Sequence, residues 1–196
     1  MHNMKNRADV TDLLKKYHTI GCCGIDCGLC PRFHTKGDSA CSGCGGPDFK
    51  IRHPSCGFVT CCVIKKGLEV CSECNDYPCS RFDSVSKGYD SFVTHKKVFS
   101  NLDFIKSKGI NSFLNHQKIR MDILIVYLVN YDDSRSKSFF CISCTLLPLD
   151  KLIETHKFID SLGESLVVNE KNKLLKEKLL LIANNLKIDL KLYNKK

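Results

Sequence analysis

Cysteine is concentrated in one part of this 196-residue chain: twelve of the fourteen cysteines lie between Cys22 and Cys79. Four of them fall within the short stretch 21–30, GCCGIDCGLC. The whole segment 22–79 holds four of the five prolines and shows little helical or strand periodicity. It cannot organise a hydrophobic core in the usual way. Its thiols therefore serve as disulfides, as a redox or catalytic site, or as metal ligands.

The cellular compartment helps to choose among these three uses. The charged N-terminus lacks the apolar stretch of a signal peptide. The most apolar run, Ile123 to Val129, is far shorter than the roughly 20 residues that cross a bilayer. We therefore expect a cytoplasmic protein that does not associate with membranes. Because cytosolic thiols stay reduced, dense cysteines there indicate metal binding or catalysis before disulfides. A disulfide framework stays open as the alternative for an exported chain.

Four Cys-x-x-Cys pairs begin at Cys27, Cys41, Cys71 and Cys141. Two residues between the thiols let a tight turn direct both sulfurs at one ion, with backbone N–H groups left to bond the sulfurs. The glycines of CSGCGG, at Cys41, suit the positive φ that often follows the second thiol. Further ligands can come from Cys23, Cys56, Cys61 and Cys79. Since four thiolates close one tetrahedral site, we expect two metal centres in residues 22–82.

Zinc suits such sulfur-rich sites and contributes folding energy where the core is thin, so we expect two zinc ions. An iron–sulfur cluster uses the same thiolates and is the alternative cofactor. Cys23, Cys27 and Cys30 also have the spacing of radical S-adenosylmethionine enzymes, but the chain lacks their alternating strands and helices. A redox-active thiol pair would need a thioredoxin-like βαβ context, which the pattern does not show.

Some cysteines are better explained as small buried side chains. Cys22 and Cys62 each adjoin another cysteine that serves equally well as a ligand. Cys141 and Cys144 stand three residues apart in an apolar run, where one helix face would bury both. We expect these two to pack, with ligation as the alternative.

The composition changes near Phe82, and we divide the chain into an N-terminal helix (1–21), a Cys-rich metal-binding module (22–82) and a mainly helical C-terminal region (83–196). Helical periodicity runs from about residue 100 to 131 with a break near Gly109, and returns at 149–159 and 169–185. The tail LKIDLKLY, residues 186–193, alternates as a strand does. The predicted fold class is α+β, mainly α, with a small irregular Cys-rich metal-stabilised module packed against a helical C-terminal part.

The formal net charge is +9. Because a four-thiolate zinc site carries about −2, two such sites lower the total to about +5. Residues 81–196 hold twenty Lys and Arg against thirteen Asp and Glu. Nucleic acid is a possible partner of this basic half, but a solvated helical surface is the favoured interpretation. An anionic ligand near Arg135, Lys137 and Cys141, or an unidentified protein, is the other kind of partner considered.

Three segments carry a resemblance to a known family: CGIDCGLCPRF, CSGCGG and HPSCGFVTCCVIKKGLEVCSECNDYPCSRF. They are similar to the cysteine-rich domain of unknown function 3795, and the downstream segments NLDFIKSKGINSFL and DDSRSKSFFCISCTLLPLDKL resemble a longer bacterial and archaeal branch. The resemblance implies metal binding without implying a reaction. The ligands it implies are Cys23, Cys27, Cys30, Cys41, Cys44, Cys56, Cys61, Cys71, Cys74 and Cys79.

We therefore predict a metal-binding protein, with zinc as the expected metal, that acts as a binding or scaffold module. The first alternative is an iron–sulfur protein that transfers electrons or senses redox state. The second is a metal-dependent enzyme with a site between the two parts, although no acid–base pair or nucleophile stands out by spacing and the catalytic residues stay unknown.

Overall fold

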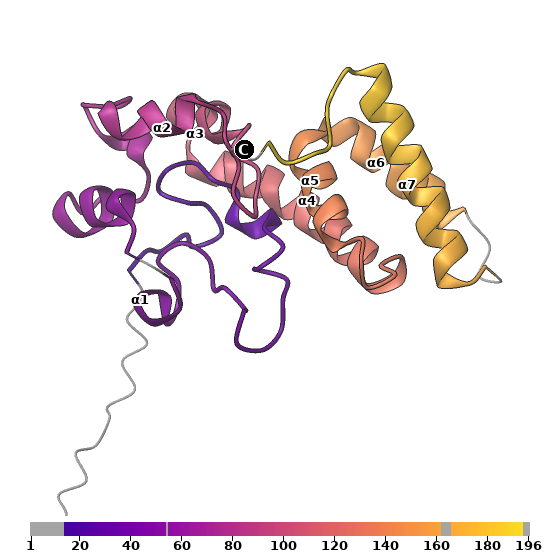
Figure 1. Ribbon diagram of the computed structural model, residues 1–196. Coiled ribbons are helices and arrows are strands. Elements are labelled where there is room, and N and C mark those ends of the chain that lie inside the picture. Colours follow the sequence, from indigo (N-terminus) through magenta and orange to yellow (C-terminus); the bar gives the residue numbers. More distant parts are fainter. Residues whose placement is uncertain (1–13, 54, 162–165, 194–196) are drawn as a thin grey trace, which may run out of the picture.

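The computed structural model describes residues 14–53, 55–161 and 166–193 of the chain. Within these ranges the protein is mainly helical, as predicted, and the strand-like pairing consists of one isolated antiparallel bridge between Ile20 and Asp26. Figure 1 shows two regions: an irregular, turn-rich N-terminal region and a region of longer helices. None of the described helices is both long and apolar enough to cross a bilayer.

The N-terminal region contains only short elements, because glycines and prolines interrupt every regular segment. η2 is a short π-helical segment and the other η elements are single 3-10 turns. In chain order the elements are η1 (Cys27–Leu29), α1 (Phe49–Arg52), η2 (Val59–Lys65), η3 (Cys71–Glu73), η4 (Ser80–Phe82) and α2 (Asp83–Ser86).

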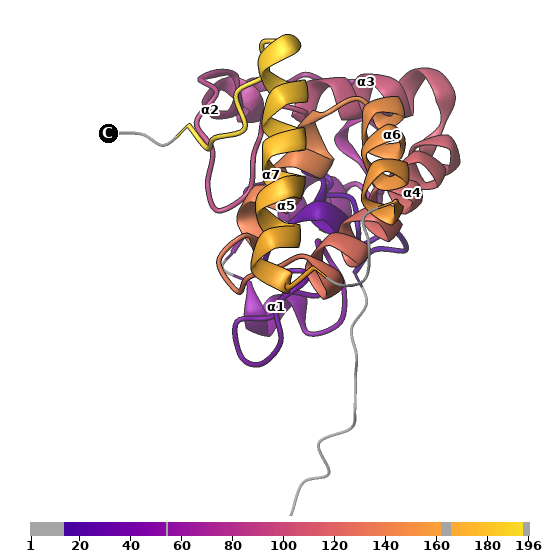
Figure 2. The same ribbon diagram turned by 90° about the vertical axis from the view of Figure 1, so that its right-hand side faces the viewer.

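Five longer helices follow, with α7 as the outermost layer against α6 (Figures 1 and 2). The predicted break at Gly109 is confirmed, since this residue ends one helix and begins the next with φ of +83°. The helices are α3 (Val98–Lys108), α4 (Ile110–Asn130), α5 (Lys137–Leu146), α6 (Leu149–Asp160) and α7 (Val168–Asn185). The apolar faces of α4, α5, α6 and α7 meet in one large cluster that includes Tyr127, Phe140, Leu152 and Leu175.

The strand predicted for residues 186–193 is wrong. This segment leaves α7 in an irregular path back toward the loop before α3 (Figure 1) and forms no β-ladder. Side chains hold it instead: Lys96 Nζ donates to the carbonyl oxygens of Asp189 and Lys191, both at 3.0 Å, and the Tyr193 N–H donates to Asp90 Oδ2 at 2.9 Å. The described part of the fold thus lacks the β component of the predicted α+β class.

The N-terminal helix predicted for residues 1–21 is also absent where the chain is described. Residues 1–13 lie outside the described ranges, and residues 14–20 form turns that end in the Ile20 bridge. The reason is that Lys15 is drawn inward. Its side chain is only 2% exposed and its Nζ donates to the Ile20 carbonyl oxygen at 2.7 Å, an arrangement that a solvent-facing helix position would not allow.

The two regions are joined by η1, which packs against α4 and α5. Leu29 of η1 is fully buried in the cluster of the C-terminal helices. Gly28 fits because it has no side chain: a Cβ atom there would lie 2.6 Å from Met121 Sδ. Gln117 of α4 fixes the junction, because its Nε2 donates both to the Thr19 carbonyl oxygen at 2.8 Å and to Asp26 Oδ1 at 2.7 Å.

A second apolar cluster lies beneath α3 and draws residues from both regions. Its fully buried members from the N-terminal region are Ile20 and Val70, and Leu102 of α3 is equally buried. A third, small cluster belongs to the N-terminal region alone, and its buried members are Cys22, Phe49, Val59 and Cys62. The Cys-rich loops are therefore anchored at their edges by packing.

Candidate metal centres

The ten cysteines predicted as ligands all line one of two cavities. We name these the six-cysteine cavity, of about 490 Å³, and the five-cysteine cavity, of about 530 Å³. The first is lined by Cys23, Cys27, Cys30, Cys41, Cys44 and Cys56. The second is lined by Cys61, Cys62, Cys71, Cys74 and Cys79. Of these eleven residues, only Cys62 is not among the predicted ligands.

Two of the Cys-x-x-Cys pairs form the tight turn that the spacing predicts. In η1 the Cys30 N–H donates to the Cys27 carbonyl oxygen at 3.1 Å. In η3 the Cys74 N–H donates to the Cys71 carbonyl oxygen at 3.0 Å. A 3-10 turn of this kind places the two thiols of a pair on the same side of the chain, so each turn presents two sulfurs to one cavity.

The loop that carries Cys41 and Cys44 has a different conformation, which depends on two glycines with positive φ. Gly43 has φ of +87°, and a Cβ atom there would lie only 2.2 Å from the His18 carbonyl oxygen. Gly45, directly after the second thiol, has φ of +71°. The expectation of positive φ after this pair is confirmed, and any larger residue at Gly43 would push the loop away from His18.

Burial in the six-cysteine cavity disfavours the ionised, thiolate form of its cysteines. It raises the pKa of Cys23 to about 12, and it raises the pKa of Cys27 and of Cys30 as well. Backbone N–H groups oppose the effect of burial, and those of Arg32 and Phe33 lower the pKa of Cys30. Such N–H···S bonds stabilise thiolates that bind a metal. A cation in the cavity would therefore find sulfurs that are already hydrogen-bonded.

Cys22 lines neither cavity, whereas Cys62 lines the five-cysteine cavity, and both are nearly fully buried, as predicted. Cys22 Sγ is 4.0 Å from Cys44 Sγ, on the side of the six-cysteine cavity. The neighbouring thiols of Cys44, Cys62 and Cys71 raise the pKa of Cys22. The Cys22 and Cys71 thiols in turn lower the pKa of Cys62. A continuous line of sulfurs thus connects the cavities.

Two lysines supply positive charge to the cysteines, and sequence reasoning missed both. Lys15, almost fully buried, lowers the pKa of Cys44 and of Cys62 through its charge. Lys66 Nζ donates to Cys74 Sγ at 2.9 Å and to Asp76 Oδ2 at 2.6 Å. In the sequence, Lys15 and Lys66 resemble ordinary solvent-exposed lysines, so their positions beside the cysteines are evident only from the tertiary structure. A buried ammonium group beside thiols favours a site with net negative charge.

The cysteines surround their cavities and do not meet at a point. Among the described residues, no three Cys, His, Asp or Glu side chains stand close enough together to hold a single metal ion. All fourteen cysteines are free thiols in the structure. Six of the predicted ligands thus line one cavity and four line the other. Neither group forms the tight tetrahedral arrangement that the sequence predicted.

The remaining cysteines and the candidate anion site lie elsewhere. Cys141 and Cys144 lie on α5 and are buried in the cluster of the C-terminal helices, in agreement with a packing role. Arg135 is exposed, and Lys137 Nζ donates to Thr35 Oγ1 at 3.3 Å. The structure therefore does not bring Arg135 and the Cys141 thiol to one site.

A family model described as "Protein of unknown function (DUF3795)" matches residues 19–84. The resemblance expected from the cysteine pattern is confirmed over residues 19–84. The match covers about a third of the chain and ends before α3, so it does not test the resemblance of the downstream segments. Neither the curated proteins nor the solved structures gave a match to this chain.

Proposed function

We propose that residues 22–82 form a metal-binding module with two centres, one in each cysteine-lined cavity. The observation that carries this proposal is the division of the ten predicted ligands, six into one cavity and four into the other. Each group is large enough to close a four-thiolate site. The metals would fix loops that bury little apolar surface, and the module would serve as a rigid binding or scaffold element joined to the helices through η1.

Charge supports this proposal independently of the cavities. A closed site of four thiolates and one divalent cation carries about −2. The buried Lys15 and the Lys66 that bonds Cys74 are the cations such sites require nearby. Zinc is the metal expected for structural sites of this composition, and its binding would contribute directly to folding.

An iron–sulfur cluster is the second candidate, favoured by the spread of the sulfurs. Zinc bonds of about 2.3 Å require four sulfurs to stand about 3.8 Å apart. The thiols of the six-cysteine cavity instead share the lining of a space of about 490 Å³ with apolar side chains such as Phe33 and Val93, and no three of the described ligand-type side chains converge. A multi-iron cluster accepts each thiolate at a separate iron atom and fills such a space. The module would then transfer electrons or respond to oxidation.

Purification without oxygen separates the two candidates. Elemental analysis and the visible spectrum are measured on the same sample. Two zinc ions per chain in a colourless protein would establish the first, and iron with acid-labile sulfide in a brown protein the second. Absence of any bound metal in protein that is folded by circular dichroism would overturn both.

Cavity-specific variants test the division into two centres. Cys27→Ser with Cys30→Ser should remove the metal of the six-cysteine cavity and leave the other centre occupied. Cys71→Ser with Cys74→Ser should do the converse. Cys144→Ala is the matched control, because this thiol is buried on α5 away from both cavities. Loss of all metal in either double variant, with the fold retained, would show one shared centre instead of two.

A further inference from the structure

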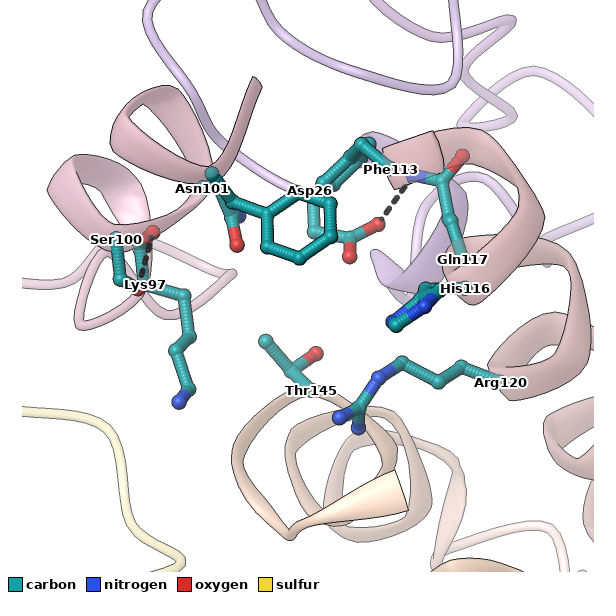
Figure 3. Close-up of a pocket in the computed structure, with 10 residues that line it drawn as sticks. Asp26, Lys97, Ser100, Asn101, Phe113, His116, Gln117, Arg120 and Thr145 are labelled. Carbon is teal, nitrogen blue, oxygen red and sulfur yellow. Dashed lines mark hydrogen bonds between the residues drawn. The ribbon is translucent and has the colours of Figure 1, made fainter. Parts of the chain in front are cut away.

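A polar cavity of about 220 Å³ lies between the two regions of the molecule and is separate from the cysteine-lined cavities. Asp26 contributes from the N-terminal region, the start of α3 contributes Lys97, and α4 contributes Arg120 (Figure 3). Thr145 of α5 and Phe113 of α4 also line this cavity (Figure 3). Four segments far apart in the sequence thus converge on one small space whose lining is mostly polar.

Arg120 is held in place by the end of a neighbouring helix. Its Nη1 donates to the carbonyl oxygens of Cys144 at 2.6 Å and of Leu147 at 2.8 Å, where α5 ends. Carbonyl groups in the last turn of a helix lack partners within the helix, so this capping explains why an arginine stands here. The guanidinium group has five donors. Capping occupies one nitrogen, and the group faces the cavity in Figure 3.

Lys97 brings a second positive charge to the same cavity. It is the residue directly before α3, and its Nζ extends into the space between α3 and α5 (Figure 3). Burial and the charge of Arg120 both lower the pKa of Lys97. Two cations that repel each other across a cavity are stabilised when an anion lies between them.

Asp26 offsets only part of this charge. Its carboxylate accepts a hydrogen bond from Gln117 at 2.7 Å, and within the described ranges it forms no ion pair with Lys97 or Arg120 closer than 4.0 Å. The cavity therefore keeps a net charge of +1 from these three groups. His116, which also faces it in Figure 3, adds positive charge when protonated.

The start of α3 adds to the attraction for an anion. Ser100 and Asn101, in its first turn, line the cavity, and no side chain caps this helix end. The N-terminus of this eleven-residue helix carries the positive end of the helix dipole, and the N–H of Val98, its first residue, donates to the His95 carbonyl oxygen at 3.0 Å. Lys97, Arg120 and this helix end act together on the same space.

We propose that this cavity binds a small organic anion through a phosphate or carboxylate group placed between Lys97 and Arg120. About 220 Å³ corresponds to roughly seven molecules of liquid water, which suits a small metabolite. Asn101 uses its Nδ2 to bond the Gly24 carbonyl oxygen at 2.9 Å, so its Oδ1 is left to accept from the ligand. A hydroxyl or amino group beside the anionic group would reach this acceptor and Asp26.

Isothermal titration calorimetry on the full chain as purified tests this site, with inorganic phosphate and acetate as probes at constant ionic strength in chloride. Saturable binding of at least one probe is expected, and Lys97→Ala should weaken it by at least about tenfold. Phosphate alone would indicate a phosphorylated ligand, and acetate alone a carboxylate. Lys97→Gln, which keeps most of the side chain, replaces Lys97→Ala if that variant does not fold.

Lys106→Ala is the matched control, because it removes the same charge from an exposed position on the same helix. It should leave binding unchanged. Binding that falls equally in both variants would reflect general attraction to a basic surface and overturn the proposal, as would no binding of either probe. Since the readout is anion affinity, the result does not depend on whether the cysteines hold metal.

Discussion

The helices α4–α7 bury a continuous cluster of leucine, isoleucine and aromatic side chains, whereas the loops around Cys22 bury a cluster of four in which two are cysteines. Tyr127, Leu152 and Leu175 are fully buried in the first cluster. Most of the cysteines in the second region stay half-buried around cavities. Apolar burial accounts for the helical region, while for the Cys-rich region our proposal adds metal–thiolate bonds as a further source of folding free energy.

Metal removal should produce the largest difference between the two regions. Structural zinc contributes about 10–16 kcal/mol in small domains, so a chelator should abolish the slow amide hydrogen exchange of residues 20–82. Helices α4, α5 and α7 should keep most of their protection, because their core does not involve the cavities. Hydrogen exchange followed by mass spectrometry measures both regions in one sample. An equal loss of protection in both regions, or no change in either region, would contradict the proposed difference between them.

Truncation of the helical core should have the opposite pattern. Leu175→Ala removes a fully buried side chain from α7 and should lower the free energy of unfolding by about 2–5 kcal/mol, with metal content unchanged. Leu180→Ala, on the same helix but 43% exposed, is the control and should cost about 0.5 kcal/mol. Chemical denaturation followed by circular dichroism gives both values. Loss of metal in Leu175→Ala would mean that the regions are not independent.

The junction between the regions can be weakened by itself. Gln117→Leu removes the hydrogen bond to Asp26 Oδ1 and one of the two bonds to the Thr19 carbonyl oxygen, which keeps the bond from the Gly28 N–H, and should cost about 2–3 kcal/mol. Exchange should rise at η1 before it rises in α7. Asn115→Ala, at an exposed position of α4, is the matched control. A uniform rise over the whole chain would indicate that the two regions unfold as one unit.

The smallest predicted effect concerns pH. Burial raises the pKa of Asp26 from 3.8 to about 6, so the folded state favours the neutral carboxyl group. Its contribution to stability is fully present below pH 4 and is lost as pH rises through 6. Between pH 5 and 7 the wild type should lose about 1 kcal/mol relative to Asp26→Asn, which keeps an acceptor for Gln117. Denaturation of both proteins at both pH values measures this difference, and a difference of opposite sign would contradict the assignment.

Local patterns predicted most of the helical region and the cysteine turns. The break at Gly109 and the 3-10 turns of the pairs at Cys27 and Cys71 depend on neighbouring residues only, so the sequence was sufficient for them. The division of the thiols between two cavities depends on how η1, η2 and η3 pack together, which spacing cannot reveal.

Two predictions failed because side chains overrode local periodicity. Residues 186–193 alternate as a strand does, but Lys96 and Asp90 bind this segment as a single extended chain. Lys15 has the spacing of a helix surface position, yet its stem packs against Gly45 and its ammonium group bonds Ile20. Neither lysine is distinguishable in sequence from the many exposed ones.

Native mass spectrometry of the chain, isolated without oxygen, tests the central claim most directly. The account predicts an intact mass that exceeds the polypeptide by two metal centres, and a stepwise loss of one centre in each cavity-specific double variant. A native mass equal to the polypeptide alone, or lowered by the hydrogens lost when thiols pair as disulfides, would contradict it.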